Sequence, residues 1–194
     1  MNRPDAALRQ ARADKLTEKL AGRPLVLVGM MGAGKTTVGR RLAARLNRQF
    51  LDSDEEIEKA AQMSIPEIFE QRGESEFRTG ETRVIARVLK DEGIVLATGG
   101  GAFVNAETRA LVKAEAVSVW LKAEADILFE RVSRRSKRPL LRTANPRATL
   151  EKLIAERYPI YAEADVTVVS RDVPQDVVAG DVVDAVLSFL KRQD

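Results

Sequence analysis

The stretch GMMGAGKTT at positions 29–37 decides the fold of this chain. Its spacing matches the phosphate-binding pattern GxxxxGK[ST], in which the second glycine precedes Lys35 and Thr36. Glycines are needed there because the backbone must adopt positive φ angles and leave its N–H groups bare, as a concave nest for phosphate oxygens. The Lys35 ammonium group can then reach the β- and γ-phosphates, and the Thr36 hydroxyl can bind Mg²⁺.

The residues on either side of this loop support the same interpretation. Four apolar residues at 25–28 follow Pro24, as expected of a strand that is buried on both faces of a parallel sheet. After the loop, Val38, Leu42 and Leu46 recur at helical spacing, so the loop opens a helix whose positive end points at the phosphates. A glycine-rich turn that binds nothing is the alternative. Strand, loop and helix together favour a nucleoside triphosphate site.

Length and charge place limits on the class of protein. A chain of 194 residues favours one well-buried domain over two. Its 32 basic and 29 acidic residues are interleaved along the chain and are not gathered in blocks. A small basic surplus of this kind permits nucleic-acid binding but is more typical of a solvated surface. We therefore expect no nucleic-acid partner, and no membrane either, because no apolar run approaches the ~20 residues that cross a bilayer.

Two residue types are missing from the chain. Cysteine is absent, which excludes disulfides and thiolate metal sites and fits a reducing compartment. Histidine is absent as well, so any general base has to be a carboxylate. The N-terminus carries acidic residues and lacks the apolar segment of a signal peptide. The expected location is the cytoplasm.

Five short apolar stretches alternate with helical patterns along the chain. The expected strands cover residues 25–28, 49–51, 94–97, 117–121 and 166–169. The clearest helical patterns cover residues 5–20, 65–71, 74–90, 105–114, 124–135, 147–163 and 175–191. Such alternation implies a parallel sheet covered by helices on both faces. The sequence therefore predicts one three-layer α/β/α domain with a five-stranded parallel sheet at 23–194, preceded by a helical extension at 1–22.

An acidic pair follows the second expected strand. Asp52 and Asp54 flank Ser53 at the carboxyl end of that strand, where α/β sheets place ligands. In extended backbone the two carboxylates project to the same side, so one could hold the hydration shell of Mg²⁺ and the other accept a proton. The alternative is a structural one, in which Ser53 or Asp54 caps the next helix. The absence of histidine favours the functional reading.

A run of three glycines and two arginines are further candidates. Gly99, Gly100 and Gly101 follow the third expected strand, which indicates a close approach of the backbone to a ligand more than a flexible turn. Arg78 and Arg157 each lie near glutamates, as they would in a surface ion-pair ladder. The planar guanidinium group also suits a bound carboxylate, and residue types alone leave these two readings open.

A basic segment at 133–145 interrupts the alternation of strands and helices. Its charged residues, grouped around Pro139, are Arg134, Arg135, Lys137, Arg138 and Arg142. A loop of this length in a compact domain is usually disordered or functional, and a triphosphate nearby favours a lid that closes over it.

Taken together, the motifs resemble the shikimate kinase family from about residue 24 to the last helix. In order they read GMMGAGKTTVGRRLA, FLDSDEEIE, IFEQRGESEFR, TGGGAF, RPLL and ERYPIYAEAD. Beyond the phosphate loop each is weak alone, whereas their order and spacing are specific. The resemblance implies a nucleoside monophosphate kinase-like fold and a monomer. It also implies transfer of the γ-phosphoryl group of ATP, with Mg²⁺, to the 3-hydroxyl of shikimate, in the pathway to chorismate and aromatic amino acids.

The resemblance also implies roles for individual residues. The catalytic residues would be Lys35, Asp54 and Arg138. The nucleotide-binding residues would be Gly32, Ala33, Gly34, Lys35, Thr36, Thr37, Arg131, Arg138 and Pro174. An acceptor-binding region at about 53–81 and the residues beyond it would supply the shikimate contacts Asp54, Arg78, Gly99, Gly100, Gly101 and Arg157. Thr36 and Asp52 would be the metal residues.

Three features depart from the family pattern. Val173-Pro174 stands where the family has an Asn-Pro pair, so the adenine contact is open. Thr36 replaces a serine and keeps the hydroxyl group. Residues 1–22 lie outside the resemblance.

Two rival functions remain at this point. The first is another small-molecule kinase of the same fold, for gluconate or a nucleoside monophosphate, although two arginines beside an aspartate suit a hydroxy acid better. The second is a nucleotide-gated binding protein without catalysis, which would be retained on polyanions in a salt-dependent manner.

Overall fold

The computed structural model describes residues 3–134 and 145–193. Its centre is a parallel sheet of β1 (Leu25–Val28), β2 (Gln49–Asp52), β3 (Ile94–Ala97), β4 (Val117–Lys122) and β5 (Val166–Val169). The strand order is β2-β3-β1-β4-β5, and every pairing is parallel. The predicted five-stranded parallel sheet is therefore confirmed. After β1 the chain runs to β2 at the edge of the sheet and then places β3 and β4 on the two sides of β1. The loop after β1 therefore lies at the point where α/β sheets bind ligands.

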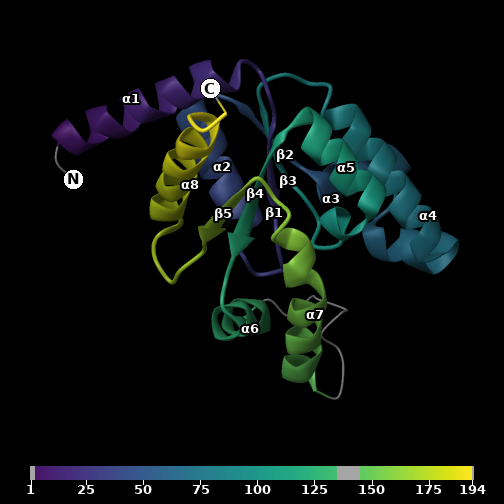
Figure 1. The fold of residues 1–194 in the computed structure, drawn as a ribbon. Coiled ribbons are helices and arrows are strands. Elements are labelled where there is room, and N and C mark those ends of the chain that lie inside the picture. The colour runs from purple at the N-terminus through teal and green to yellow at the C-terminus, as the bar shows by residue number, and fades with distance from the viewer. Residues whose placement is uncertain (1–2, 135–144, 194) are drawn as a thin grey trace.

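Helices cover both faces of this sheet. α1, α2 and α8 gather on one side and α4 and α5 on the other, while α6 and α7 stand at the end to which the β4 arrow points (Figure 1). The helices are α1 (Arg3–Leu20), α2 (Lys35–Leu46), α3 (Ser53–Ala61), α4 (Ile65–Val88), α5 (Ala106–Glu115), α6 (Ala125–Ser133), α7 (Pro146–Tyr161) and α8 (Gln175–Leu190), with a short 3-10 helix η1 (Ala102–Val104).

The helix α4 contains a kink that the sequence predicts as a break. Ser64 and Glu67 form a capping box at its start, which satisfies backbone N–H groups of the first turn. Gly73 has φ 79° and ψ 172°, which is not helical. The segment is therefore two helical pieces that meet at Gly73, close to the two helices expected at 65–71 and 74–90.

The central strands β1 and β3 are buried at every position, as their unbroken apolar runs predict. The N-terminal helix α1 joins the same hydrophobic core, because Ala13, Leu16 and Leu20 are fully buried. On its outer side, Arg12 contacts both carboxylate oxygens of Asp184 in α8 at 2.7 Å. The extension thus packs against the domain that follows it.

In the described part of the chain, no helix is both long and apolar enough to cross a membrane.

Candidate active site

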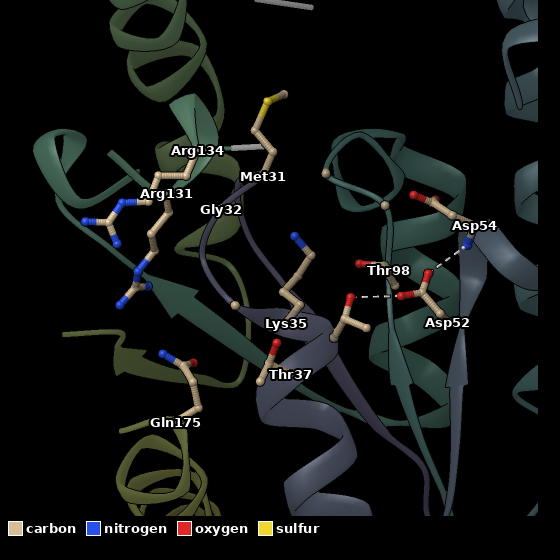
Figure 2. Close-up of a pocket in the computed structure, with 14 residues that line it drawn as sticks. Met31, Gly32, Lys35, Thr37, Asp52, Asp54, Thr98, Arg131, Arg134 and Gln175 are labelled. Carbon is tan, nitrogen blue, oxygen red and sulfur yellow. Dashed lines mark hydrogen bonds between the residues drawn. The ribbon is translucent and has the colours of Figure 1, made fainter. Parts of the chain in front are cut away.

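A pocket of about 360 Å³ lies at the carboxyl edge of the sheet, where the loops after β1, β2 and β3 meet α6 and α8. Figure 2 shows Arg131 of α6 and Arg134 just after that helix on one side, the carboxylates of Asp52 and Asp54 on the other, and Lys35 between them. The lining residues are Met31, Gly32, Gly34, Lys35, Thr36, Thr37, Asp52, Asp54, Thr98, Gly99, Gly100, Arg131, Arg134 and Gln175.

The loop after β1 has the geometry that phosphate binding requires. Gly29, Gly32 and Gly34 have φ angles of 137°, 82° and 94°, which glycine adopts without strain. Gly34 is also the N-cap of α2 and has no side chain that could cap the first turn. Because the first N–H groups of a helix have no intrahelical acceptor, they are available to an anion.

Lys35 extends across the mouth of this loop. Its Nζ donates to the carbonyl oxygens of Gly29 at 2.8 Å and Met30 at 2.9 Å. These contacts hold the ammonium group beside the helix N-terminus, between the two charged sides of the pocket (Figure 2). A cation there can neutralise charge on phosphates that the loop binds.

Thr36 and Asp52 are in direct contact. The Thr36 hydroxyl donates to Asp52 Oδ2 at 2.9 Å, which joins the first turn of α2 to the end of β2. Both side chains present oxygen atoms, the ligand type that Mg²⁺ prefers. Since Mg²⁺ is usually bound by one or two protein groups together with phosphate and water, this pair fits such an ion.

The acidic pair differs from the expected geometry in one respect. Asp52, and neither Ser53 nor Asp54, caps α3: its Oδ1 accepts the backbone N–H of Asp54 at 3.1 Å. Asp54 is thus helical and not extended, so the prediction that both acids project from one extended strand was wrong. Both still line the pocket, because the first turn of a helix points back toward the strand end. The capping and pocket roles of Asp52 coexist.

The glycine run lies against side chains of this same chain. A Cβ atom at Gly99 would lie 2.7 Å from Asp54 Oδ1 and 3.2 Å from Glu81 Oε1. A Cβ atom at Gly101 would lie 2.6 Å and 2.7 Å from the two terminal nitrogens of Arg78. Gly99 and Gly101 are therefore needed to admit Asp54 and Arg78. The residues predicted to bind an acceptor are brought together here.

Arg78 forms ion pairs with both neighbouring glutamates, one exposed and one buried. The Arg78 Nη2 lies 3.3 Å from Oε1 of the exposed Glu74. The Arg78 Nη1 contacts Glu81 Oε2 at 2.7 Å, and Glu81 is only 1% exposed. Burial raises the pKa of Glu81, and the hydrogen bond from Arg78 opposes that rise. For Arg78, burial lowers the pKa, but the hydrogen bonds and charges of Glu81 and Glu74 outweigh it, so the net shift is upward. The guanidinium group therefore stays charged and is held in place by a buried acid.

Arg157 reaches the glycine run from α7. Its Nη1 donates to the Gly100 carbonyl at 3.3 Å. Arg78 and Arg157 thus approach the loop after β3 from two different helices, although neither lines the pocket beside the phosphate loop. Two guanidinium groups that meet beside one short loop can together hold a carboxylate.

The side of the pocket formed by α6 is anchored to the sheet. Arg131 Nη1 donates to Ser170 Oγ at 3.1 Å, and its Nη2 donates to the Arg171 carbonyl at 2.7 Å. Ser170 Oγ in turn donates to the Ala33 carbonyl at 2.8 Å. This chain of contacts links the predicted adenine residue to the phosphate loop.

The structure places Gln175, and not the predicted Pro174, in the lining of the pocket. Its Oε1 is buried and has no hydrogen-bond partner within 3–134 or 145–193. The remaining prediction for this side, Arg138, lies outside the described residues, as do Arg135, Lys137 and Arg142.

Sequence reasoning also missed Met31 and Thr98, which line the pocket, and two residues that support it, Glu81 and Ser170. Glu81 is visible only as an acid three positions after Arg78, which would look the same on a surface. Ser170 gives no signal at all, because its role depends on the proximity of β5 to the phosphate loop.

Comparisons with known proteins agree on one family. A family model described as Shikimate kinase matches residues 31–190. A shikimate kinase of Rhodopseudomonas palustris is 55% identical over 185 residues, which are 95% of this chain and 91% of that protein. The solved structure of shikimate kinase from Acinetobacter baumannii in complex with shikimate has a TM-score of 0.83 and 40% identity, covering 89% of this chain and 97% of that one.

A gluconokinase from Sinorhizobium meliloti shares the fold with a TM-score of 0.56, covering 89% of this chain and 93% of that one, but is only 17% identical. A likeness at that identity concerns the fold alone, so the comparisons favour the first family over the gluconate rival. The alignment with the Rhodopseudomonas protein covers 95% of this chain and therefore includes part of residues 1–22. The family model, in contrast, begins at residue 31 and leaves residues 1–22 outside.

Proposed function

This chain belongs to the shikimate kinase family, and from that premise we propose how its residues transfer the γ-phosphoryl group of ATP to the 3-hydroxyl of shikimate. One observation carries the proposal: the loop after β3 holds Asp54 at Gly99 and Arg78 at Gly101, beside the phosphate loop. A carboxylate that can bind a hydroxyl and a guanidinium group that can bind a carboxylate suit a hydroxy acid.

The phosphate loop binds the triphosphate through the N–H groups at the start of α2. Lys35 then moves from the carbonyls of Gly29 and Met30 to the β- and γ-phosphates, where it offsets the negative charge that is spread over the transferred group. Because the loop dipoles are already aligned, little reorganisation is needed during the reaction.

Thr36 and Asp52 are the residues we assign to Mg²⁺, Thr36 as a ligand and Asp52 through a bound water. When bound there, the ion would supply positive charge that offsets the charge of the phosphate groups. Asp52 also fixes the first turn of α3 by capping it, so the same carboxylate positions Asp54.

The acceptor binds between the glycine run and α7. Arg78 and Arg157 hold its carboxylate through paired hydrogen bonds, which lysine cannot reproduce. Asp54 then binds the hydroxyl and accepts its proton as the phosphoryl group is transferred. Glu81 keeps the Arg78 guanidinium in the orientation that this requires.

Several finer assignments belong to the same proposal. Arg131 lies against the adenine ring, in line with its contacts to Ser170 and Arg171. Arg138 reaches the phosphates from a lid at 133–145, by resemblance alone. We also propose that the protein acts as a monomer in the cytoplasm, with no nucleic-acid or membrane partner.

A coupled assay of the purified protein tests the substrate. ATP and Mg²⁺ are supplied with shikimate, with gluconate and with a panel of nucleoside monophosphates. We expect ADP formation with shikimate alone. Turnover of gluconate or of a nucleotide at a comparable kcat/KM would contradict the proposal.

Two variants test the arginine pair. Arg78→Lys and Arg157→Lys should raise the KM for shikimate about tenfold or more, since the loss of a bidentate contact to a charged group removes about 1.5–3 kcal/mol. The KM for ATP should change little. An equal rise for both substrates would mean that the two arginines have a structural role only.

A further inference from the structure

Tyr161, the last residue of α7, makes a contact to the glycine run that the proposed mechanism leaves unused. The residue is fully buried, and its hydroxyl donates to the Gly100 carbonyl. The same carbonyl accepts from Arg157, which stands one helical turn earlier. Because residues four apart share one helix face, the two side chains reach Gly100 together.

Tyr161 also contacts the phosphate loop. Its hydroxyl oxygen lies 3.9 Å from Met30 Sδ, and the hydroxyl carries a single proton, which is given to Gly100. Gly100 itself packs on the phosphate loop: a Cβ atom there would lie 3.6 Å from the Met31 nitrogen and 3.7 Å from the Gly29 carbonyl. Tyr161 thus stands where the nucleotide half and the acceptor half of the site meet.

The hydroxyl is a permanent donor under physiological conditions. Burial raises the pKa of Tyr161 to about 12, against smaller opposing effects of the Arg157 charge and of a hydrogen bond between Arg157 and the Tyr161 side chain. The proton therefore stays on the oxygen at neutral pH, and the bond to Gly100 keeps one direction.

We propose that Tyr161 is a positioning residue that holds the Gly100 carbonyl, so that Arg157 can turn toward the shikimate carboxylate. A carbonyl oxygen has two lone pairs, and Tyr161 satisfies it when the guanidinium group moves. Without the hydroxyl, Arg157 would be the remaining side-chain donor to this part-buried carbonyl, and each move toward the substrate would take that donor away. This inference rests on the proposed function, in which Arg157 binds the acceptor.

Tyr158 supplies a matched control on the same helix. Its hydroxyl donates to the Ala123 carbonyl, and its ring meets the edge of Trp120 with centroids 4.9 Å apart. Tyr158→Phe therefore removes the same kind of bond from the same aromatic cluster, but away from Gly100. Both Phe variants keep the ring and should show similar, modest decreases in melting temperature.

The test compares Tyr161→Phe, Tyr158→Phe and the wild-type protein in steady-state kinetics and in calorimetric titration with shikimate. We expect Tyr161→Phe to raise both the KM and the Kd for shikimate about fivefold to tenfold, as the loss of one part-buried hydrogen bond would. Its KM for ATP should stay within about twofold of wild type, and Tyr158→Phe should leave both constants within that range.

Equal shikimate constants for the two variants would overturn the inference, as would a parallel rise for ATP and shikimate in Tyr161→Phe. Failure of the proposed function is distinguishable from either result, because the wild-type protein would then not phosphorylate shikimate at all.

Discussion

Replacing Gly101 with alanine is a steric test of the position of Arg78. Gly101 has φ −94° and ψ −18°, a conformation that any L-residue adopts, so the substitution strains no backbone. The new methyl group would lie 2.6 Å and 2.7 Å from the two terminal nitrogens of Arg78. Since non-bonded atoms prefer about 3.5 Å or more, the guanidinium group has to move by roughly 1 Å.

The displacement should affect substrate binding more than stability. The Arg78 side chain is 28% exposed and flexible, so it can yield, and the free energy of unfolding should fall by about 1 kcal/mol, the lower end of the cost of overpacking. Its 2.7 Å contact to the buried Glu81 would lengthen, and the carboxylate of shikimate would meet a misplaced partner. Misplacement by about 1 Å can reduce activity by up to about a hundredfold. We expect the KM for shikimate to rise about tenfold to a hundredfold, with the KM for ATP unchanged.

Steady-state kinetics and thermal unfolding measure these effects, with two glycine controls. A Cβ atom at Gly80, in α4, would meet nothing within 4 Å, so Gly80→Ala should keep wild-type kinetics and gain about 0.5–1 kcal/mol from helix propensity. At Gly100, the nearest side-chain atom would be Arg157 Nη1 at 3.6 Å, an ordinary contact, and Gly100→Ala should have a small effect. A Gly101→Ala enzyme with a normal KM for shikimate would refute the placement of Arg78 in the acceptor site.

Three further predictions concern the phosphate loop, the N-terminal helix and pH. Lys35→Met should lower kcat by about a hundredfold or more in a protein that still unfolds cooperatively; near-normal turnover would remove its assigned role. Leu16→Ala, at a fully buried position of α1, should cost about 2–5 kcal/mol of unfolding free energy. Arg12→Ala, at a half-exposed ion pair, should cost at most about 1 kcal/mol. Chemical denaturation measures both values, and the reverse order would mean that α1 is held mainly by charge. Because the pKa of Tyr161 is raised from 10.0 to about 12, its stabilising contribution is fully present below pH 10 and is lost as pH rises through that interval. Wild type should therefore lose more stability than Tyr161→Phe between about pH 10 and 12, and parallel denaturation curves there would contradict this.

The sequence by itself determines the nucleotide half of this protein. The strand 25–28, the glycines of the loop and the apolar spacing of α2 are neighbours along the chain, so their pattern predicts one local structure. The alternation of apolar stretches and helices likewise predicts a parallel sheet with helices on both faces, because periodicity reflects burial within each element. The break at Gly73 was also predictable, since glycine adopts the positive φ that ends a helix.

Residue types were sufficient to nominate the acceptor residues but not to place them. For Arg78, the neighbouring glutamates left a surface ladder and a binding site equally open. The structure shows ion pairs to both Glu74 and Glu81 and adds that Glu81 is buried, which residue spacing does not reveal. For the acidic pair, the choice of cap depended on where β2 ends, and Asp52 took that place in the structure. The first residue of a helix can shift by one or two positions with tertiary packing. Local sequence patterns do not contain that information.

The tertiary structure alone decided which groups meet. Gly101 and Arg78 come from the β3–η1 loop and α4, and Tyr161 reaches Gly100 from the far end of α7. Ser170 joins β5 to the phosphate loop, and Gln175 enters the pocket where Pro174 was expected. Such contacts join segments that are distant in the chain, and they depend on strand order and on side-chain burial. Strand order and burial follow from the packing of the whole domain and not from the conformational preference of any single stretch of sequence.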